Sequence, residues 1–353
     1  MLGMAEPRYR VGIIGTGRIA STIQDEVVTS PFSFLLPYSH AGAYEAHPAT
    51  KIVAAADPNA ERIEAFGERW SVDRLYADYQ QMLSAEGLDI VSVCVPTRAH
   101  AEVMAAIATS GTRGVFMEKP ICRTLREADA MIAAADRKGI KVVVNHVRTF
   151  DPYYRRIRWL IESGAIGRVR SVMVRWHEGM SFGGSHLFDL LRFLLGSEAC
   201  WVFGHLDDGD GVFDPGGSGV IGFTDDVEVF LDNRVGHAAP RELDIAGDAG
   251  RIRIGDTLFP EFFTKDDRSQ FGELLHRPFP GSVIGTSPMT VAVDELVRAI
   301  ETGAKPGSDL RDGRANLELA VAFHLSSQEK RPIDLPVATE ALDLVVDDPW
   351  GRS

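Results

Sequence analysis

The sequence predicts two domains, an N-terminal α/β domain built on a doubly wound parallel sheet and a C-terminal α+β domain with an open, mostly antiparallel sheet. The chain has 353 residues, more than a single hydrophobic core usually holds. Over the first 145 residues, short apolar runs rich in β-branched residues alternate with helical patterns. Beyond residue 150, strands follow one another and the helices are grouped apart. We therefore place the domains at residues 1–148 and 149–353.

The expected strands of the first domain are continuous apolar runs, which are typical of strands that helices cover on both faces. Helical patterns separate these runs, so each strand is followed by a crossover helix and the sheet is parallel. The strands are expected at 10–14, 52–56, 90–95, 114–117 and 141–145, and the helices at 18–28, 60–70, 79–84, 100–110 and 125–138.

The second domain mixes a few helices with several short strands separated by turns. One helix is expected to end at Gly196, because glycine readily adopts the left-handed conformation found after a helix. Strands in succession, with helices gathered to one side, are typical of an α+β domain. The helices are expected at 152–162, 186–195, 289–302 and 311–328, and the strands at 168–177, 227–231, 242–246 and 251–254.

The composition excludes several classes of partner. A net charge of −13 argues against nucleic acid and anionic membranes, which bind clustered lysines and arginines. Cys94, Cys122 and Cys200 have neither CxxC nor metal-ligand spacing, so we expect reduced cysteines and no metal site. No run approaches the roughly 18 apolar residues of a membrane span, and the first ten residues carry no apolar signal-peptide core. We expect a cytoplasmic, enzyme-like protein.

A glycine-rich turn follows the first strand. Residues 11–20 read VGIIGTGRIA and match G-x-G-x-x-[GA], with Gly15, Gly17 and Ala20 at the small positions. Gly15 makes the tight turn, Gly17 lets the backbone approach a diphosphate, and Ala20 lets helix and strand pack closely. The helix N-terminus adds N–H donors and partial positive charge. This pattern predicts a Rossmann dinucleotide site that includes Gly15, Thr16, Gly17, Arg18 and Ile19.

An acidic residue, Asp57, ends the second expected strand, where the adenosine ribose should lie. It follows Gly17 by 40 residues rather than the roughly 20 of the usual fingerprint. We attribute the excess to an insertion near residues 25–40, because PFSFLLP contains two prolines and cannot continue a helix. A carboxylate at the ribose favours NAD over NADP, since a 2′-phosphate would meet a like charge. The alternative role for Asp57 is to cap the next helix.

Longer segments of the chain resemble the Gfo/Idh/MocA family, named for glucose-fructose oxidoreductase and inositol dehydrogenase. These segments are GIIGTGRIA at 12–20, AADP at 55–58, SVCVPTRAH at 92–100, MEKP at 117–120, NHVRTFDPYY at 145–154, HLFDLLRFLLG at 186–196 and IAGDAGRIRI at 245–254. The resemblance covers most of the chain. It implies NAD(P)-linked oxidation or reduction of sugars, cyclitols or their derivatives. It also implies a substrate domain whose open sheet often mediates oligomerisation, here as a homodimer or homotetramer.

The resemblance also implies roles for individual residues. Thr97 and His100 would lie along the nicotinamide half of the cofactor, and Pro96 and Glu118 would belong to the same cofactor site. Lys119 would face the substrate hydroxyl as well as the cofactor. His186 would handle the proton. Family members commonly carry an aspartate four residues before this histidine, where this chain has Phe182. His177, Glu178 or Asp189 are candidates to compensate.

Oxidising an alcohol requires a base that accepts the hydroxyl proton as the hydride leaves carbon. The usual lysine pKa of about 10.4 is high for this task, but burial and the positive nicotinamide ring would lower the pKa of Lys119. Histidine, with an ordinary pKa of about 6.5, suits it directly. We hypothesise that His186 transfers the proton while Lys119 polarises the oxygen, or that the roles are exchanged. The alternatives are a surface lysine in a turn and a histidine at a helix N-terminus without a ligand.

Asp189 lies three residues after His186, on the same helix face, where it could orient the imidazole. Equally, it could cap backbone or pair with Arg192. We count Lys119, His186 and Asp189 as the candidate catalytic set. The candidate substrate-binding residues are Lys119, Arg148, Tyr153, Trp176, His177 and His186.

The sequence therefore predicts an NAD-dependent dehydrogenase that acts on a secondary alcohol of a small polyhydroxy compound. A redox-neutral alternative fits the same residues: an enzyme that oxidises one carbon transiently, eliminates at its neighbour and reduces again, which cleaves a glycoside. A third interpretation is a sensor that binds NAD(P) without turnover. Retention of both Lys119 and His186 argues against a sensor, which has no need of proton-transfer groups.

Overall fold

The computed structural model describes residues 8–207, 214–234, 241–255, 258–266, 268, 272–281 and 286–346. The chain divides into two compact units. Among the described residues, 8–152 and 286–314 belong to the first unit, and 153–281 and 315–346 belong to the second.

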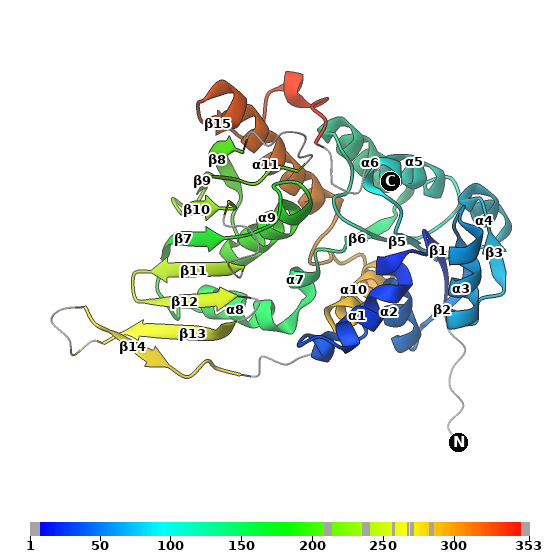
Figure 1. The fold of residues 1–353 in the computed structure, drawn as a ribbon, viewed down its shortest axis with the longest axis horizontal. Helices are drawn as coiled ribbons and strands as arrows, with labels where there is room; N and C mark the ends of the chain where they lie inside the picture. Colours follow the sequence, from blue (N-terminus) through cyan, green and yellow to red (C-terminus); the bar gives the residue numbers. More distant parts are fainter. Residues whose placement is uncertain are drawn as a thin grey trace. The chain divides into compact units, whose positions relative to one another are not determined.

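The first unit contains a six-stranded sheet in the order β3-β2-β1-β4-β5-β6 (Figure 1). Every neighbouring pair in this sheet is parallel, which confirms the expected doubly wound architecture. A short third strand was not expected from the sequence, because three residues are too few to give a pattern. The strands are β1 (Tyr9–Ile14), β2 (Thr50–Ala56), β3 (Arg74–Tyr76), β4 (Ile90–Val93), β5 (Gly114–Met117) and β6 (Lys141–Val144).

The helices of the first unit include one that the sequence analysis missed, α2 (His40–Ala46). Its N-cap is Ser39, whose hydroxyl accepts a hydrogen bond from Gly42 N. The prolines of the preceding insertion hid this helix, which lies directly after them in the chain. The other helices are a π-helical turn (Arg18–Thr22) that leads into α1 (Ile23–Val28), then α3 (Ala60–Trp70), α4 (Tyr79–Ala85), α5 (His100–Ile107), α6 (Leu125–Lys138), α7 (Val147–Phe150) and α10 (Pro288–Thr302), with 3₁₀ turns at Ser33–Leu35 and Thr97–Ala99.

Helix α10 comes late in the sequence but packs in the first unit. Its apolar face, which includes Met289, Val293 and Leu296, is fully buried in one core with Tyr44 of α2 and Phe116 of β5. The sequence analysis assigned this helix to the second domain, because position along the chain was the only guide. The structure assigns it by the surface that it buries.

The second unit contains a nine-stranded sheet in the order β14-β13-β12-β11-β7-β10-β9-β8-β15. Its neighbouring strands are antiparallel except for β7 and β10, so the expected α+β architecture is confirmed. The strands are β7 (Val169–Arg175), β8 (Ala199–Leu206), β9 (Gly217–Phe223), β10 (Glu228–Asp232), β11 (Glu242–Gly247), β12 (Gly250–Gly255), β13 (Leu258–Lys265), β14 (Leu274–Arg277) and β15 (Ile333–Asp334).

Helices α8 (Pro152–Glu162), α9 (Phe182–Leu195) and α11 (Leu310–Glu329) accompany this sheet, followed by a 3₁₀ turn at Thr339–Ala341. Figure 1 shows α9 and α11 lying beside strands β7 to β10. Phe188 of α9 and Phe323 of α11 stack with ring centroids 5.8 Å apart, and both are fully buried. Ser326 and Ser327 of α11 accept hydrogen bonds from the backbone of β8, which fastens the helix to the sheet. None of the described helices is long and apolar enough to cross a bilayer.

Candidate active site

Five parallel strands of the first unit end in one row. The register pairs Ile14 with both Ala56 and Val93, and it pairs Met117 with both Val93 and Val144. The side chains that follow these ends therefore gather at one edge of the sheet, the carboxyl edge, where open α/β sheets bind their ligands. The residues directly after the five strands are Asp57, Gly15, Cys94, Glu118 and Asn145.

Gly15 occupies a position that only glycine tolerates. Its φ angle of +86° lies in the left-handed region. A Cβ there would lie 2.7 Å from the carbonyl oxygen of Cys94 on the neighbouring strand end. Its N–H donates to Ala56 O at 2.8 Å, so the turn is fixed between two strands.

Gly17 faces open space, because a Cβ at this position would meet nothing within 4 Å. Ala20, in contrast, is fully buried. Arg18 is exposed and forms a bidentate ion pair with Glu26, with Nε–Oε1 and Nη2–Oε2 distances of 2.6 and 2.7 Å. Ile19 is half-buried. An unobstructed backbone at the start of the helix fits the diphosphate of a dinucleotide.

Asp57 is buried and holds the glycine turn. Its Oδ2 accepts hydrogen bonds from Thr16 N at 2.8 Å and Thr16 Oγ1 at 3.0 Å, and its Oδ1 accepts one from Asn59 N at 2.9 Å. The side chain of Asn59, not Asp57, caps α3, so the capping alternative for Asp57 is wrong. Arg62 Nη1 lies 3.7 Å from Oδ2. The carboxylate thus joins the ends of β1 and β2.

His100 connects the chain segments that follow β4 and β5. Its Nε2 lies 2.9 Å from Val95 O, and its Nδ1 lies 3.0 Å from Pro120 O. The ring is almost fully buried, and this burial lowers the pKa of His100. Thr97 is buried in the 3₁₀ turn that begins after Pro96. The ring therefore fixes the turn that carries Pro96 and Thr97.

Lys119 is only 8% exposed, which excludes the alternative of a surface lysine in a turn. The carboxylate of the preceding residue, Glu118, lies within hydrogen-bond distance of two side chains that the sequence analysis did not consider. These are His40 on α2, with Nε2 2.9 Å from Oε1, and Asn145 after β6, whose Nδ2 donates to Oε1 at 2.6 Å. Separations of 78 and 27 residues left no local pattern that could have indicated these contacts.

In the second unit, His186 lies one turn inside α9 rather than at its N-terminus, because the helix begins at Phe182. The side chain of His186 is half-buried. Asp189, on the same face, is 4% exposed, and its Oδ1 accepts a hydrogen bond from Asn316 Nδ2 of α11 at 3.2 Å. Arg192 forms a bidentate ion pair with Glu198 and also donates to Asn316 Oδ1. Asn316 thus bridges Asp189 and Arg192.

A carboxylate from a distant segment caps α9. Asp214 Oδ1 accepts from Ser181 N at 2.6 Å, and Asp214 Oδ2 accepts from Phe182 N at 2.8 Å. This explains why the helix starts four residues earlier than the sequence suggested, in spite of two glycines in its first turn. The structure therefore brings a carboxylate to the backbone of Phe182, the position where the resembling family carries an aspartate side chain.

The remaining candidate substrate residues lie in both units. Arg148 is half-buried on α7 of the first unit. In the second unit, Tyr153 of α8 contacts Tyr154 edge to face, at a centroid distance of 4.9 Å. Trp176 is buried under the Arg241 guanidinium, 5.5 Å from the ring centroid, and is followed by half-buried His177. Arg241 also forms an ion pair with Glu178.

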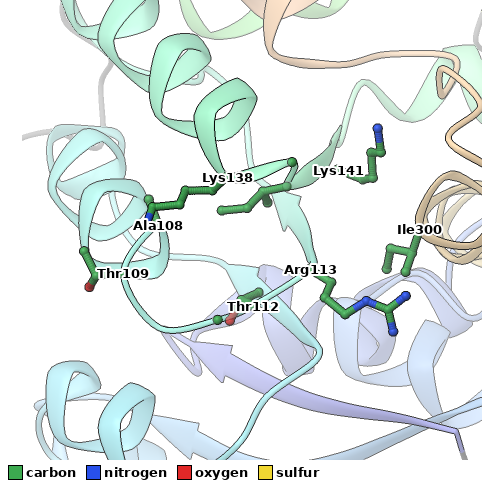
Figure 2. Close-up of a pocket in the computed structure, with 10 residues that line it drawn as sticks. Ala108, Thr109, Thr112, Arg113, Lys138, Lys141 and Ile300 are labelled. Carbon is green, nitrogen blue, oxygen red and sulfur yellow. The ribbon is translucent and has the colours of Figure 1, made fainter.

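A pocket of about 340 Å³ lies at the opposite edge of the parallel sheet, where β5 and β6 begin (Figure 2). Arg113 precedes β5 and Lys141 begins β6, so the pocket lies at the amino ends of these strands. The glycine turn and Lys119 follow the carboxyl ends of β1 and β5. This pocket is therefore separate from the candidate active site.

The two glycines of the turn predict different defects. Gly17→Ala should leave the melting temperature unchanged and weaken NAD binding by about tenfold or more, because the added methyl group enters the space that a diphosphate would take. Gly15→Ala should lower the melting temperature, because its Cβ meets a carbonyl oxygen at 2.7 Å. Calorimetric titration and thermal unfolding measure the two effects. Native NAD affinity in Gly17→Ala would contradict the assignment.

Asp57 predicts cofactor preference. Asp57→Ala should weaken NAD binding much more than NADP binding, because the carboxylate that repels a 2′-phosphate is lost. Thr16→Ala is the matched control: it removes one hydrogen bond to Asp57 but keeps the charge, so both affinities should fall alike. Calorimetry with both cofactors gives the ratio. Equal weakening by Asp57→Ala would rule out a role at the ribose.

Comparison with known proteins supports the resemblance to the Gfo/Idh/MocA family in the N-terminal part of the chain. Residues 9–146 match the Gfo/Idh/MocA model, described as an oxidoreductase family with an NAD-binding Rossmann fold. The chain is 28% identical to the oxidoreductase YrbE of Bacillus subtilis over 206 residues, which cover 54% of this chain and 55% of YrbE. It is 26% identical to the inositol 2-dehydrogenase of Rhizobium meliloti, over 92% of this chain and 99% of that protein. The WlbA dehydrogenase of Bordetella pertussis, solved with NADH and UDP-GlcNAcA, has the same fold, with a TM-score of 0.77 and 20% identity over 95% of this chain and 99% of that one. Residues 9–146 thus match the NAD-binding Rossmann domain of the Gfo/Idh/MocA oxidoreductases.

Proposed function

We propose that this NAD-dependent oxidoreductase transfers a hydride between the nicotinamide ring and a secondary alcohol of a sugar, a cyclitol or a related polyhydroxy compound. The observation that carries the proposal is Lys119, a buried amine two residues after the end of β5, at the sheet edge that bears the glycine turn. A relative aligned over 92% of this chain is an inositol 2-dehydrogenase, which supports an alcohol as substrate.

In this proposal the cofactor supplies the hydride acceptor or donor, and side chains of the chain handle the proton. His186 takes the hydroxyl proton, because an imidazole titrates near neutral pH. Lys119 donates a hydrogen bond to the same oxygen, or the two exchange roles. Asp189 is held by Asn316, so it is a fixed carboxylate on the face of α9 that bears His186.

The proposed substrate-binding residues are one arginine and three aromatic side chains that lie between Lys119 and His186 in the sequence. Arg148 offers a guanidinium that suits a hydroxylated or acidic ligand. Tyr153, Trp176 and His177 offer aromatic walls with polar tips, which suit sugar rings. NAD is the preferred cofactor, with Asp57 as the acid that discriminates against NADP.

We also propose that the protein forms a homodimer or homotetramer through the open face of the second sheet. Met173, Phe203 and Phe230 are 56%, 45% and 36% exposed. The register aligns Phe230 with Met173 and Val220, and Val220 with Phe203, so an apolar row crosses four strands. The same row continues through Asp244, Arg253 and Glu261, which carry both signs of charge. An apolar patch beside mixed charges suits a second copy of the same surface.

The cytoplasm is the proposed location. The three cysteines are free thiols, a state that a reducing compartment preserves.

Lys119→Ala and His186→Ala should each lower kcat/KM by about 10²–10⁴-fold, because proton transfer loses its group. The assay follows NADH at 340 nm with inositols, aldoses, sugar nucleotides and glycosides, and Lys138→Ala, an exposed lysine of the first unit, is the control. Product without NADH would indicate redox-neutral glycoside cleavage, and binding without turnover would indicate a sensor. Near-native turnover in both variants would contradict the proposed mechanism.

Phe203→Glu and Phe230→Glu should convert the oligomer to smaller species without changing the circular dichroism spectrum, because each places a charge in the apolar row. Val28→Glu, at a 56% exposed position of the first unit, should leave the assembly intact. Sedimentation velocity gives the mass of each variant. A monomeric wild-type protein would contradict this proposal.

A further inference from the structure

Five polar side chains are buried together in the first unit, and one of them belongs to Glu118, the residue before Lys119. His40 and Tyr44 come from α2, Ser92 comes from β4, and Glu118 and Asn145 follow β5 and β6. Each of the five is at most 9% exposed. We call them the buried polar cluster. Elements far apart in the sequence supply them, so the fold, not a local motif, assembles the cluster.

The hydrogen bonds of the buried polar cluster have a defined direction. An ionised carboxylate only accepts, so His40 donates from Nε2 and Asn145 donates from Nδ2 to the same oxygen of Glu118. His40 Nδ1 lies 2.7 Å from Ser92 Oγ, and Tyr44 OH lies 3.1 Å from that hydroxyl. A chain of hydrogen bonds therefore leads from Tyr44 through Ser92 and His40 to Glu118.

Glu118 is ionised in spite of its burial. Burial raises the pKa of its carboxyl group, but the hydrogen bonds from His40 and Asn145 and the charge of Lys119 outweigh this and hold the pKa below its usual value. The cluster thus keeps a negative charge next to the proposed catalytic amine.

The amide of Asn145 is oriented by the same carboxylate. Because Nδ2 faces Glu118, Oδ1 faces away from it, and this buried oxygen has no hydrogen-bond partner among the described residues. A buried acceptor without a donor is unfavourable and rare in native proteins. It is therefore a place where a bound ligand can supply the donor.

We propose that His40 is a positioning residue: by donating to Glu118, it keeps an ionised carboxylate beside Lys119 and holds the Asn145 amide in one orientation. The inference rests on the proposed function, because it explains how the amine used in that reaction is held. Glu118 then acts within the protein, through Lys119 and Asn145, rather than as a direct ligand of the cofactor.

The variants separate this role from simple core packing. His40→Leu removes both hydrogen bonds at similar volume, while His40→Gln keeps an N–H donor near the place of Nε2. Glu118→Gln removes the charge and keeps the shape. His47→Leu is the matched control, because His47 at the end of α2 is also a buried histidine, 8% exposed, and its Nε2 lies 2.9 Å from a carboxylate oxygen of Asp294.

The first measurement needs no turnover. Competitive acetylation of the cofactor-free enzyme with acetic anhydride, read by mass spectrometry across pH, gives the titration midpoint of the Lys119 amine. His40→Leu and Glu118→Gln should move this midpoint down by about one pH unit, because a nearby negative charge favours the ammonium form. His40→Gln and His47→Leu should leave it unchanged. The titratable groups that interact with Glu118 are His40, Cys94, His100 and Lys119.

The second measurement uses the substrate found in the polyol panel. His40→Leu should lower kcat by about 100-fold, with KM, NAD affinity and melting temperature close to those of His47→Leu, because the reacting groups are misplaced rather than lost. His40→Gln should restore most of kcat. Native kcat together with a native Lys119 midpoint in His40→Leu would overturn the inference.

If His40→Leu does not fold, His40→Asn replaces it in both measurements. Asparagine is one methylene shorter than glutamine and does not reach Glu118 from the same backbone position, so equal results for the two amides would overturn the inference. Wild-type protein that turns over no polyol, while its Lys119 midpoint still depends on residue 40, would contradict the proposed function and support the positioning role.

Discussion

One buried negative charge constrains the first unit. The carboxylate of Glu118 is ionised although it is buried in the core. Hydrogen bonds from His40 on α2 and from Asn145 after β6 stabilise its negative charge. Breaking such a pair from one side costs about 3–5 kcal/mol, a large part of the roughly 5–15 kcal/mol that stabilises a typical domain. One carboxylate therefore connects three elements: it follows β5, and it holds the position of α2 and of the residue after β6.

A second carboxylate works in the same way at the same edge of the sheet. The carboxylate of Asp57 accepts hydrogen bonds from the backbone N–H and the hydroxyl of Thr16, so the end of β2 holds the glycine turn that follows β1. The parallel register makes such a contact between neighbouring strand ends possible, because all five strands end in one row. The groups that meet a cofactor are thus placed by rigid strands and held by buried charges, which is how a binding site gains precision.

The second unit uses a carboxylate differently. Asp214 does not join strands but satisfies the first N–H groups of α9, which carries His186 and Asp189. The helix therefore begins one turn before the histidine. A fixed helix start sets the direction in which the imidazole points, so Asp214 contributes to the geometry of the proposed proton-transfer residue even though it lies 28 residues further along the chain.

Much of the fold could be predicted from local patterns. Five of the six strands of the first sheet are apolar runs, and α3, α6 and α8 begin and end at the residues expected from the sequence. What failed had no local signal. Helix α2 follows two prolines, α9 has two glycines in its first turn, and α10 packs against a sheet whose strands lie far from it in the sequence.

The candidate site also contains features that the sequence predicted and contacts that only the structure revealed. The sequence alone determined the glycine turn, the acid at the end of β2 and the lysine after β5, because each depends on neighbours a few residues away, whereas the structure decided that this lysine is buried. Only the tertiary structure decided that Asp57 holds Thr16 and that Glu118 is held by His40 and Asn145. The reason is physical: a hydrogen bond to a buried charge depends on distance in space, and the pairs that form it can lie anywhere along the chain.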